Sequence, residues 1–405
     1  MKKSFRLGLL PKVILAIALG IGCSCFFPMW LMRVFFTFND IFSHFLNFFI
    51  PFIILGLVAP GIAELGNGAG RLLGVTALLA YLSTVLAGFF SYATCVGVFP
   101  SFLHAGMYAA EAAEMGKEAI APYFTIEMPP VMEVMSALIL SFVLGLGLSA
   151  VKGGTFKNLL SEFREVVTMT ISKVVIPLFP LYIFGIFMKL CAEGEVGHIL
   201  QVFLKVIVVI FAIHIVWLLF QFMVAGAVSR KNPFRCLWNM LSAYVTALGT
   251  QSSAATIPVT LAQAKKNGVN EGIADFVIPL CATIHLAGST LKIVACAYAI
   301  VLMGGLHGDV GTFAGFILML GITMVAAPGV PGGAIMAALG LLSSMLGFDD
   351  TLLGMMIALY ITMDSFGTAC NVTGDGAIAL IVDSIYRKKG SEGAKKEAAA
   401  SVPNA

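Results

Sequence analysis

The strongest constraint on this chain is a series of apolar segments, each about as long as a bilayer is thick. A transmembrane helix needs ~20 mostly apolar residues. Candidate spans in the first part of the chain are 9–30, 40–64, 72–97, 129–151, 167–191 and 197–228. Because 59% of the 405 residues are hydrophobic and only 11% are charged, a soluble domain would have little polar surface. The sequence therefore predicts an all-α integral membrane protein.

Three other features of the sequence narrow the class of protein further. The segment "ALGIGCSCFF" could end a signal peptide, but a first membrane span is the better interpretation because more spans follow. The eight cysteines contain no CxxC pair, so neither a zinc site nor a disulfide framework is indicated. A net charge of +3 is too small to indicate a nucleic-acid partner.

The loops between the first six spans alternate in charge. "MKKSFR", "KGGTFKNLLSEFR" and "SRKNPFR" are basic, whereas residues 98–128 and "CAEGEVGH" are acidic. Lys and Arg concentrate in cytoplasmic loops. This alternation predicts six crossings with the N-terminus in the cytoplasm.

Two later segments have loops of the same charge at both ends, so each must enter the membrane and return. The first, with the centre "TQSSAATIPV", lies between Arg235 and Lys265, both in basic loops. The second, "GITMVAAPGVPGGAIMAALG", lies between Asp309 and Asp349. We expect two re-entrant helical hairpins, which enter from opposite faces.

Single crossings at 270–304 and 351–386 complete a predicted total of eight transmembrane helices with both termini cytoplasmic. Non-helical backbone at membrane depth is tolerated only inside protein or beside a cavity. Two such hairpins are typical of an inverted-repeat transporter with its site at the midplane. The alternative, ordinary spans kinked by Gly and Pro, leaves the charge signs unexplained. The polar tail 387–405 is predicted to be disordered.

The last span carries four polar residues on one helical stripe: Asp364, Thr368, Asn371 and Asp375, at spacings of four, three and four. Carboxylates in the bilayer are costly and usually face the bundle interior or a cavity. The stripe therefore predicts a polar wall for ions or a charged solute. The alternative is that one carboxylate merely pairs with an intramembrane lysine.

A second stripe lies in "TIHLAGSTLKI", where His285, Ser289 and Lys292 are spaced four and three apart. A buried lysine must find a partner or lose its proton. Gly288 and the mixed polarity suggest that this helix is interrupted. His214 has no polar stripe around it and is interpreted as structural.

The stretches "TQSSAATIPVT", "APGVPGGAIM" and "NVTGDG" resemble the two hairpin tips and the last helix of the dicarboxylate/amino acid:cation symporters, the glutamate transporter family. The similarity runs from about Tyr81 to Val382. It implies a homotrimer of elevator type, in which each protomer has a scaffold and a mobile transport domain. The implied divisions are scaffold helices in 1–71, a transport-domain helix in 72–97, a loop and scaffold helix in 98–166, a scaffold helix in 167–191, a transport-domain helix in 192–228, the transport core in 229–386 and the tail.

The resemblance also implies roles for individual residues. Asp364 would hold the substrate amino group, Thr368 and Asn371 would contact the amino group and α-carboxylate, and the two hairpin tips would bind carboxylate and close over the substrate. The candidate substrate-binding residues are Ser252, Ser253, Ser289, Lys292, Val330, Gly333, Asp364, Gly367, Thr368 and Asn371. The candidate cation-binding residues are Cys281, Thr283, His285, Met324, Val325, Ala327, Asn371 and Asp375, with sodium at Asp375 and Asn371. Tyr81 and Thr84 match part of a third cation site.

The third cation site departs from the family pattern. The family motif Asn-Met-Asp-Gly-Thr is here "HLAGS", so His285 and Ala287 replace two sodium ligands, and Val85 replaces a serine ligand. We therefore expect fewer sodium ions, with His285 either a weak ligand or a proton carrier.

The substrate site departs from the family pattern as well. Gly367 stands where acidic amino acid transporters carry the arginine that grips the side chain, and Gln251 replaces the first-tip arginine. Lys292 replaces a tyrosine near the missing arginine. We expect a neutral amino acid, or alternatively an acidic amino acid or dicarboxylate held by Lys292.

Two other function classes fit less well. An intramembrane aspartyl protease would need Gly-x-Gly-Asp, where this chain has Val372, and its two aspartates would have to share a proton across ~16 Å of one helix. A channel does not account for two hairpins that act as gates. The prediction is a secondary symporter of the bacterial inner membrane, not an enzyme, with Na⁺ or H⁺ as the coupling ion, no other cofactor, and a small-molecule substrate and lipid as partners.

Overall fold

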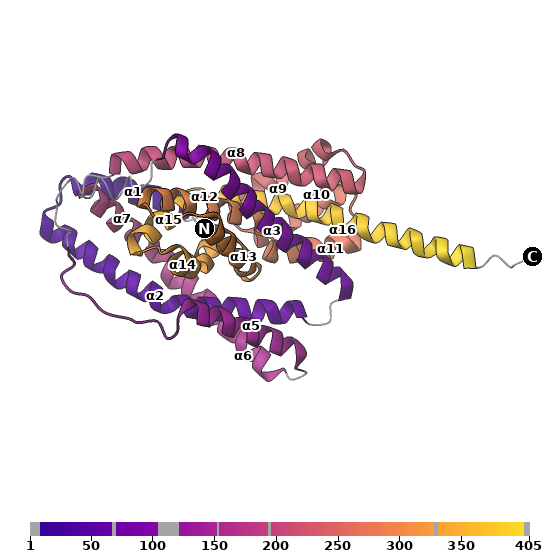
Figure 1. Cartoon of the computed structure of the whole chain (residues 1–405), viewed down its shortest axis with the longest axis horizontal. Coiled ribbons are helices and arrows are strands. Elements are labelled where there is room, and N and C mark those ends of the chain that lie inside the picture. Colours follow the sequence, from indigo (N-terminus) through magenta and orange to yellow (C-terminus); the bar gives the residue numbers. More distant parts are fainter. Residues whose placement is uncertain are drawn as a thin grey trace, which may run out of the picture.

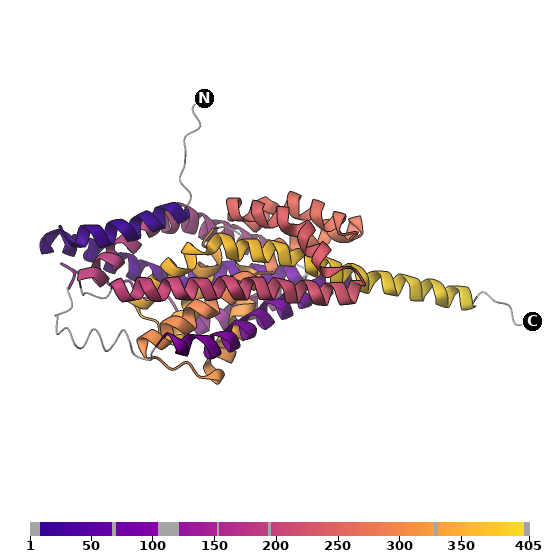
Figure 2. The same cartoon turned by 90° about the horizontal axis from the view of Figure 1, so that it is seen from above.

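The computed structural model describes residues 9–66, 70–103, 121–151, 154–192, 196–327 and 331–400. Within these ranges all regular structure is helical, as predicted. The longest helices run roughly along one long axis, and the last of them extends beyond the bundle toward the C-terminus (Figures 1 and 2).

The helices follow one another in this order: α1 (Leu9–Ser24), α2 (Met29–Gly66), α3 (Gly70–Val98), η1 (Phe99–Ser101), α5 (Val134–Ala150), α6 (Thr155–Thr170), η2 (Ile171–Val175), α7 (Ile176–Ala192), α8 (Val196–Ser229), α9 (Pro233–Thr250), α10 (Ser253–Lys266), α11 (Glu271–Ile284), α12 (Ala287–Gly304), α13 (Val310–Ala326), α14 (Gly333–Leu346), α15 (Asp350–Thr362) and α16 (Asp364–Ala400). Each of the eight expected spans corresponds to one helix or one interrupted pair. In the part of the chain that the structure describes, five helical segments are long and apolar enough to cross a bilayer. The bent pair α15–α16 is a sixth, and α1 and α5 contain shorter apolar helices.

Two of the spans are interrupted inside the bundle. Helix α11 ends at Ile284 and α12 begins at Ala287, which is the interruption expected near Gly288. The span 351–386 was expected to cross as one helix, but it bends by 60° between α15 and α16 at Met363. Because a broken helix leaves backbone N–H groups without intrahelical partners, each break creates a polar position in an apolar environment.

Both predicted hairpins are present as pairs of helices that pack on each other. Helices α9 and α10 are joined at Gln251, whose φ of 52° is left-handed, and Ser252 caps α10. Helices α13 and α14 form the second pair, and Gly332, with φ 74°, precedes α14. The second tip includes residues 328–330, so Val330 lies outside the described residues.

The end of the chain differs from the expectation of a disordered tail. Helix α16 continues to Ala400, and its projecting end is visible in Figure 1. The segment is rich in Lys, Glu and Ala, which are strong helix formers, so a helix extends readily from the buried part of α16.

Helix α12 lies at the centre of the core. It is buried along almost its whole length and packs against α3, α8, α15 and α16. Its approach to α16 requires glycine at one position: a Cβ on Gly288 would lie 2.5 Å from the Cβ of Cys370 and 2.7 Å from the carbonyl oxygen of Gly367. This close packing places the two polar stripes side by side.

Candidate functional site

The first polar residue of the last span lies beside the bend at Met363. Asp364 begins α16 immediately after that bend and is only 4% exposed. The N-terminus of a helix favours negative charge because its N–H groups are unpaired and its dipole is positive there. The bend therefore supports a carboxylate at membrane depth.

Both oxygens of the Asp364 carboxylate have partners. Lys292 Nζ donates to Oδ1 at 3.2 Å, and the backbone N–H of Gly332 donates to Oδ2 at 2.8 Å. Lys292 is fully buried, and its Nζ also lies 3.4 Å from the centroid of the Tyr360 ring. The ion pair thus joins α12, α14 and α16, and removing one partner of such a buried pair costs about 3–5 kcal/mol.

The lysine also occupies the space that the absence of a side chain at Gly367 leaves open. A Cβ on Gly367 would lie 3.0 Å from Lys292 Nζ and 3.2 Å from its Cε. The sequence left two alternatives for Lys292, pairing with Asp364 or turning toward Gly367. The structure shows both, because one position of the ammonium satisfies the two descriptions.

Asn371 bonds to the backbone at the start of α12, just after the break between α11 and α12. Its Oδ1 accepts the backbone N–H groups of Gly288 at 2.8 Å and Ser289 at 3.2 Å, and its Nδ2 donates to Ser289 Oγ at 2.9 Å. Thr368 Oγ1 donates to the carbonyl oxygen of Asp364, one turn earlier. The stripe therefore faces α12. In this structure Asn371 stabilises the contact between α16 and α12, whereas the bond of Thr368 lies within α16.

Asp375 lies at the far end of the stripe beside His285. His285 Nδ1 donates to Asp375 Oδ1 at 2.9 Å, and both side chains are at most 1% exposed. Nε2 of the same imidazole lies 3.0 Å from Ser83 Oγ, which accepts from Gln221 Nε2 at 2.9 Å. Within the described part of the chain, Asp375 Oδ2 is buried without a hydrogen-bond partner. That oxygen suits a cation, whereas Oδ1 is already occupied by the imidazole.

The remaining candidate site residues lie at or near the ends of helices. Ser252 Oγ accepts the N–H of Ala255 as the cap of α10, and Ser253 begins that helix as a buried residue. Cys281 is buried, and its carbonyl oxygen accepts the N–H of His285. Thr283 lies near the end of α11, and the candidates at the end of α13, which packs on α11, are Met324, Val325 and Ala327.

The third cation site that the resemblance implies has an apolar setting. Val85 and Ala287 both belong to the buried apolar core. Thr84 Oγ1 is buried without a partner among the described residues, and Tyr81 donates to the carbonyl oxygen of Leu318. The surroundings offer a cation a hydroxyl but no carboxylate from these positions.

Three residues that contribute to the site were not identified from the sequence. Tyr360 was not singled out, and neither were Ser83 and Gln221. A signal existed for Gln221, because it lies two turns after His214 on one face of a largely apolar helix. His214 Nε2 donates to the carbonyl oxygen of Gly288 at 3.0 Å, which fits its interpretation as structural.

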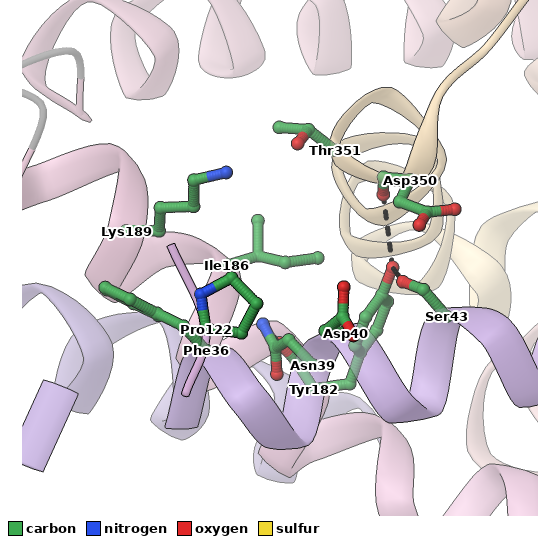
Figure 3. Close-up of a pocket in the computed structure, with 10 residues that line it drawn as sticks. All are labelled: Phe36, Asn39, Asp40, Ser43, Pro122, Tyr182, Ile186, Lys189, Asp350 and Thr351. Carbon is green, nitrogen blue, oxygen red and sulfur yellow. Dashed lines mark hydrogen bonds between the residues drawn. The ribbon is translucent and has the colours of Figure 1, made fainter. Parts of the chain in front are cut away.

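A separate polar cavity of about 150 Å³ lies among α2, α7 and α15 (Figure 3). Tyr182 donates its hydroxyl hydrogen to the carbonyl oxygen of Asp350 at 3.1 Å, and its oxygen lies 3.1 Å from Ser43 Oγ. Asn47 Nδ2 donates to Asp350 Oδ1 at 3.2 Å. These bonds connect α15 to α2 and α7, two helices that the sequence assigns to a scaffold.

Comparison with known protein families gives a match over nearly the whole chain. The model of the sodium:dicarboxylate symporter family matches residues 9–385. The chain belongs to this family. Its members are transporters, so the chain is a membrane transporter and not an enzyme, and the resemblance inferred from the sequence is confirmed.

Relatives within the family differ in the substrates that their names state. The serine/threonine transporter SstT of Acinetobacter baumannii (strain AYE) is 29% identical over 392 residues, which cover 93% of this chain and 97% of the relative. SstT of Acinetobacter baylyi is 26% identical over 393 residues, with the same coverage. Excitatory amino acid transporter 2 of Mus musculus is 28% identical over 250 residues, which cover 60% of this chain and 44% of the relative.

Proposed function

We propose that this member of the family is a symporter that carries a small neutral amino acid together with a cation. The observation that carries the proposal is the position of Lys292, whose ammonium pairs with Asp364 and fills the space beside Gly367. While Asp364 neutralises this lysine, the ammonium fills the space beside Gly367 that an acidic side chain would need. The names of the serine/threonine transporters among the relatives support the same substrate class.

In the proposed loaded state, the substrate amino group bonds to Asp364 and the substrate carboxylate receives backbone N–H groups at the hairpin tips. Asp364 is suited to this role because it is a buried carboxylate at a helix N-terminus that faces both α12 and α14. Thr368 and Asn371 lie on the same stripe and would complete the contacts.

The coupling cation is proposed to bind at Asp375. Its unpartnered Oδ2 supports this position, and sodium is the ion that the family description names. His285 occupies Oδ1, and Ala287 contributes no carboxylate, so we propose fewer sodium ions than in acidic amino acid transporters. The alternative is a proton carried by His285.

The assembly is also a proposal. We infer a homotrimer in the bacterial inner membrane with both termini cytoplasmic, and an elevator motion of α8–α16 and α3 against a scaffold of α1, α2 and α5–α7. The bonds of Tyr182 and Asn47 to Asp350 would then lie between the scaffold and the moving part.

An acidic amino acid or dicarboxylate is the second candidate substrate. It is favoured by the position of Lys292 Nζ beside Gly367, where acidic amino acid transporters place their arginine. A substrate that drew Asp364 away from Lys292 would leave an ammonium at that position to receive a second carboxylate.

Uptake by purified protein in proteoliposomes tests both candidates. We expect accumulation of labelled serine or alanine that requires a cation gradient and is inhibited by alanine, serine or methionine, but not by aspartate or glutamate. Strong inhibition by aspartate or glutamate alone, abolished by Lys292→Met, would overturn the neutral substrate. Passive flux that no cation gradient drives would indicate a channel.

A further inference from the structure

The ammonium of Lys292 occupies the position in which Asp364 would receive the amino group of a substrate. It lies 3.2 Å from Asp364 Oδ1, while Gly332 of α14 bonds the other oxygen. Each oxygen of the carboxylate therefore has a partner within the protein. This arrangement is relevant to one step of the transport cycle, the return of the carrier across the membrane without substrate.

A symporter that accumulates substrate must return across the membrane without it. During that return, a carboxylate that is only 4% exposed would lose its cationic partner. A buried charge without a partner is strongly disfavoured in a bilayer. On the basis of the proposed function, we infer that Lys292 is a tethered counter-cation that replaces the substrate amino group on Asp364 during the substrate-free return.

The surroundings of Lys292 allow its ammonium to leave Asp364 when substrate arrives. Nζ lies 3.4 Å from the centroid of the Tyr360 ring, which attracts a cation through its face. The lysine stem is flexible, and Gly367 contributes no side chain that would restrict the movement of the ammonium. Lys292 thus has a second partner within reach, so exchange of one ammonium for another does not leave it isolated.

The charges balance in both halves of the cycle. Asp364 and Lys292 sum to zero when the pocket is empty, and a zwitterionic amino acid adds no net charge when it binds. The pocket therefore needs no additional cation from solution to neutralise Asp364 during the return. A carrier without Lys292 would return with an uncompensated carboxylate.

Comparison of two transport modes tests the inference. Exchange, with unlabelled serine inside the vesicles and labelled serine outside, requires only the loaded carrier to cross. Net uptake into vesicles without serine also requires the empty return. For Lys292→Met we expect net uptake to fall at least ~10-fold relative to exchange, while Lys292→Arg keeps much of its net uptake because it retains a cation.

Lys205→Met is a matched control, since Lys205 also lies near an aromatic ring, 5.7 Å from the centroid of Phe102, but on the exposed side of α8. We expect this variant to transport like wild type in both modes. Lys292→Ala provides a second measurement: n-butylammonium inside the vesicles should restore net uptake by supplying an ammonium to Asp364, which a purely structural lysine would not explain.

The outcomes separate this inference from the proposed function. Wild-type net uptake by Lys292→Met, or an equal loss of both modes in Lys292→Met and Lys292→Ala without rescue by n-butylammonium, would overturn the counter-cation. Wild-type protein that exchanges neither serine nor alanine would overturn the proposed substrate class, and the counter-cation with it. If Lys292→Met does not fold, the rescue of Lys292→Ala and the activity of Lys292→Arg decide the question.

Discussion

His285 and Asp375 form a buried pair in which the imidazole Nδ1 lies 2.9 Å from the carboxylate Oδ1, and neither side chain is accessible. The resemblance places a sodium ligand at Asp375. In this chain a neighbouring side chain already binds one oxygen of that ligand. Because the imidazole occupies this oxygen, the pair affects how many cations can accompany each substrate.

The first prediction concerns the number of coupled sodium ions. Because Ala287 supplies no carboxylate and His285 occupies Asp375 Oδ1, reversal potentials measured under imposed gradients should give fewer than three sodium ions per substrate. The double variant His285→Asn and Ala287→Asp restores the family residues and should raise the count by about one, since carboxylate and amide oxygens suit a hard cation. A wild-type count of three would contradict the reduced site.

The second prediction separates the two aspartates. Asp364→Asn removes a charged hydrogen-bond acceptor worth ~1.5–3 kcal/mol, so the substrate concentration at half-maximal uptake should rise by roughly 10- to 150-fold. Asp375→Asn should instead weaken the dependence of uptake on the cation. Asp309→Asn, at the exposed cap of α13, is the control and should leave both properties unchanged. Coupled uptake at wild-type level in both site variants would refute the assignment.

The third prediction concerns Gly367 and Lys292. Gly367→Arg should abolish uptake, because its Cβ would lie 3.0 Å from Lys292 Nζ and two cations would share one space. Adding Lys292→Tyr removes both conflicts and restores the family pattern, so the double variant should take up labelled aspartate. Aspartate uptake by the Gly367→Arg variant alone would show that Lys292 does not fill this space.

The fourth prediction concerns the contact between α12 and α16. Gly288→Ala would place a Cβ 2.5 Å from that of Cys370, and overpacking of this kind costs about 1–3 kcal/mol. The apparent melting temperature in detergent should fall accordingly. Gly97→Ala in α3 meets nothing within 4 Å and gains helix propensity, so it should be neutral or slightly stabilising. Equal melting temperatures for the two variants would argue against a close contact at Gly288.

The class of protein, the positions of the apolar spans and the two hairpin segments can be read from the amino-acid sequence. The reason is that a bilayer imposes a length and an apolar composition on each crossing, and loop charge records the side on which each crossing ends. The stripe from Asp364 to Asp375 followed from helical periodicity alone. The interruption near Gly288 was also visible, because polar and small residues meet there.

The pairing of the buried polar groups, in contrast, depends on how the helices pack. The bend at Met363 places Asp364 at a helix N-terminus, a position that a continuous span would not provide. The partners of Asp364 and Asp375 come from residues 72 and 90 positions earlier in the chain, Lys292 and His285. Periodicity describes one helix at a time, whereas these pairs depend on how helices pack against each other. Because of this packing, the ammonium of Lys292 lies both beside Asp364 and beside Gly367.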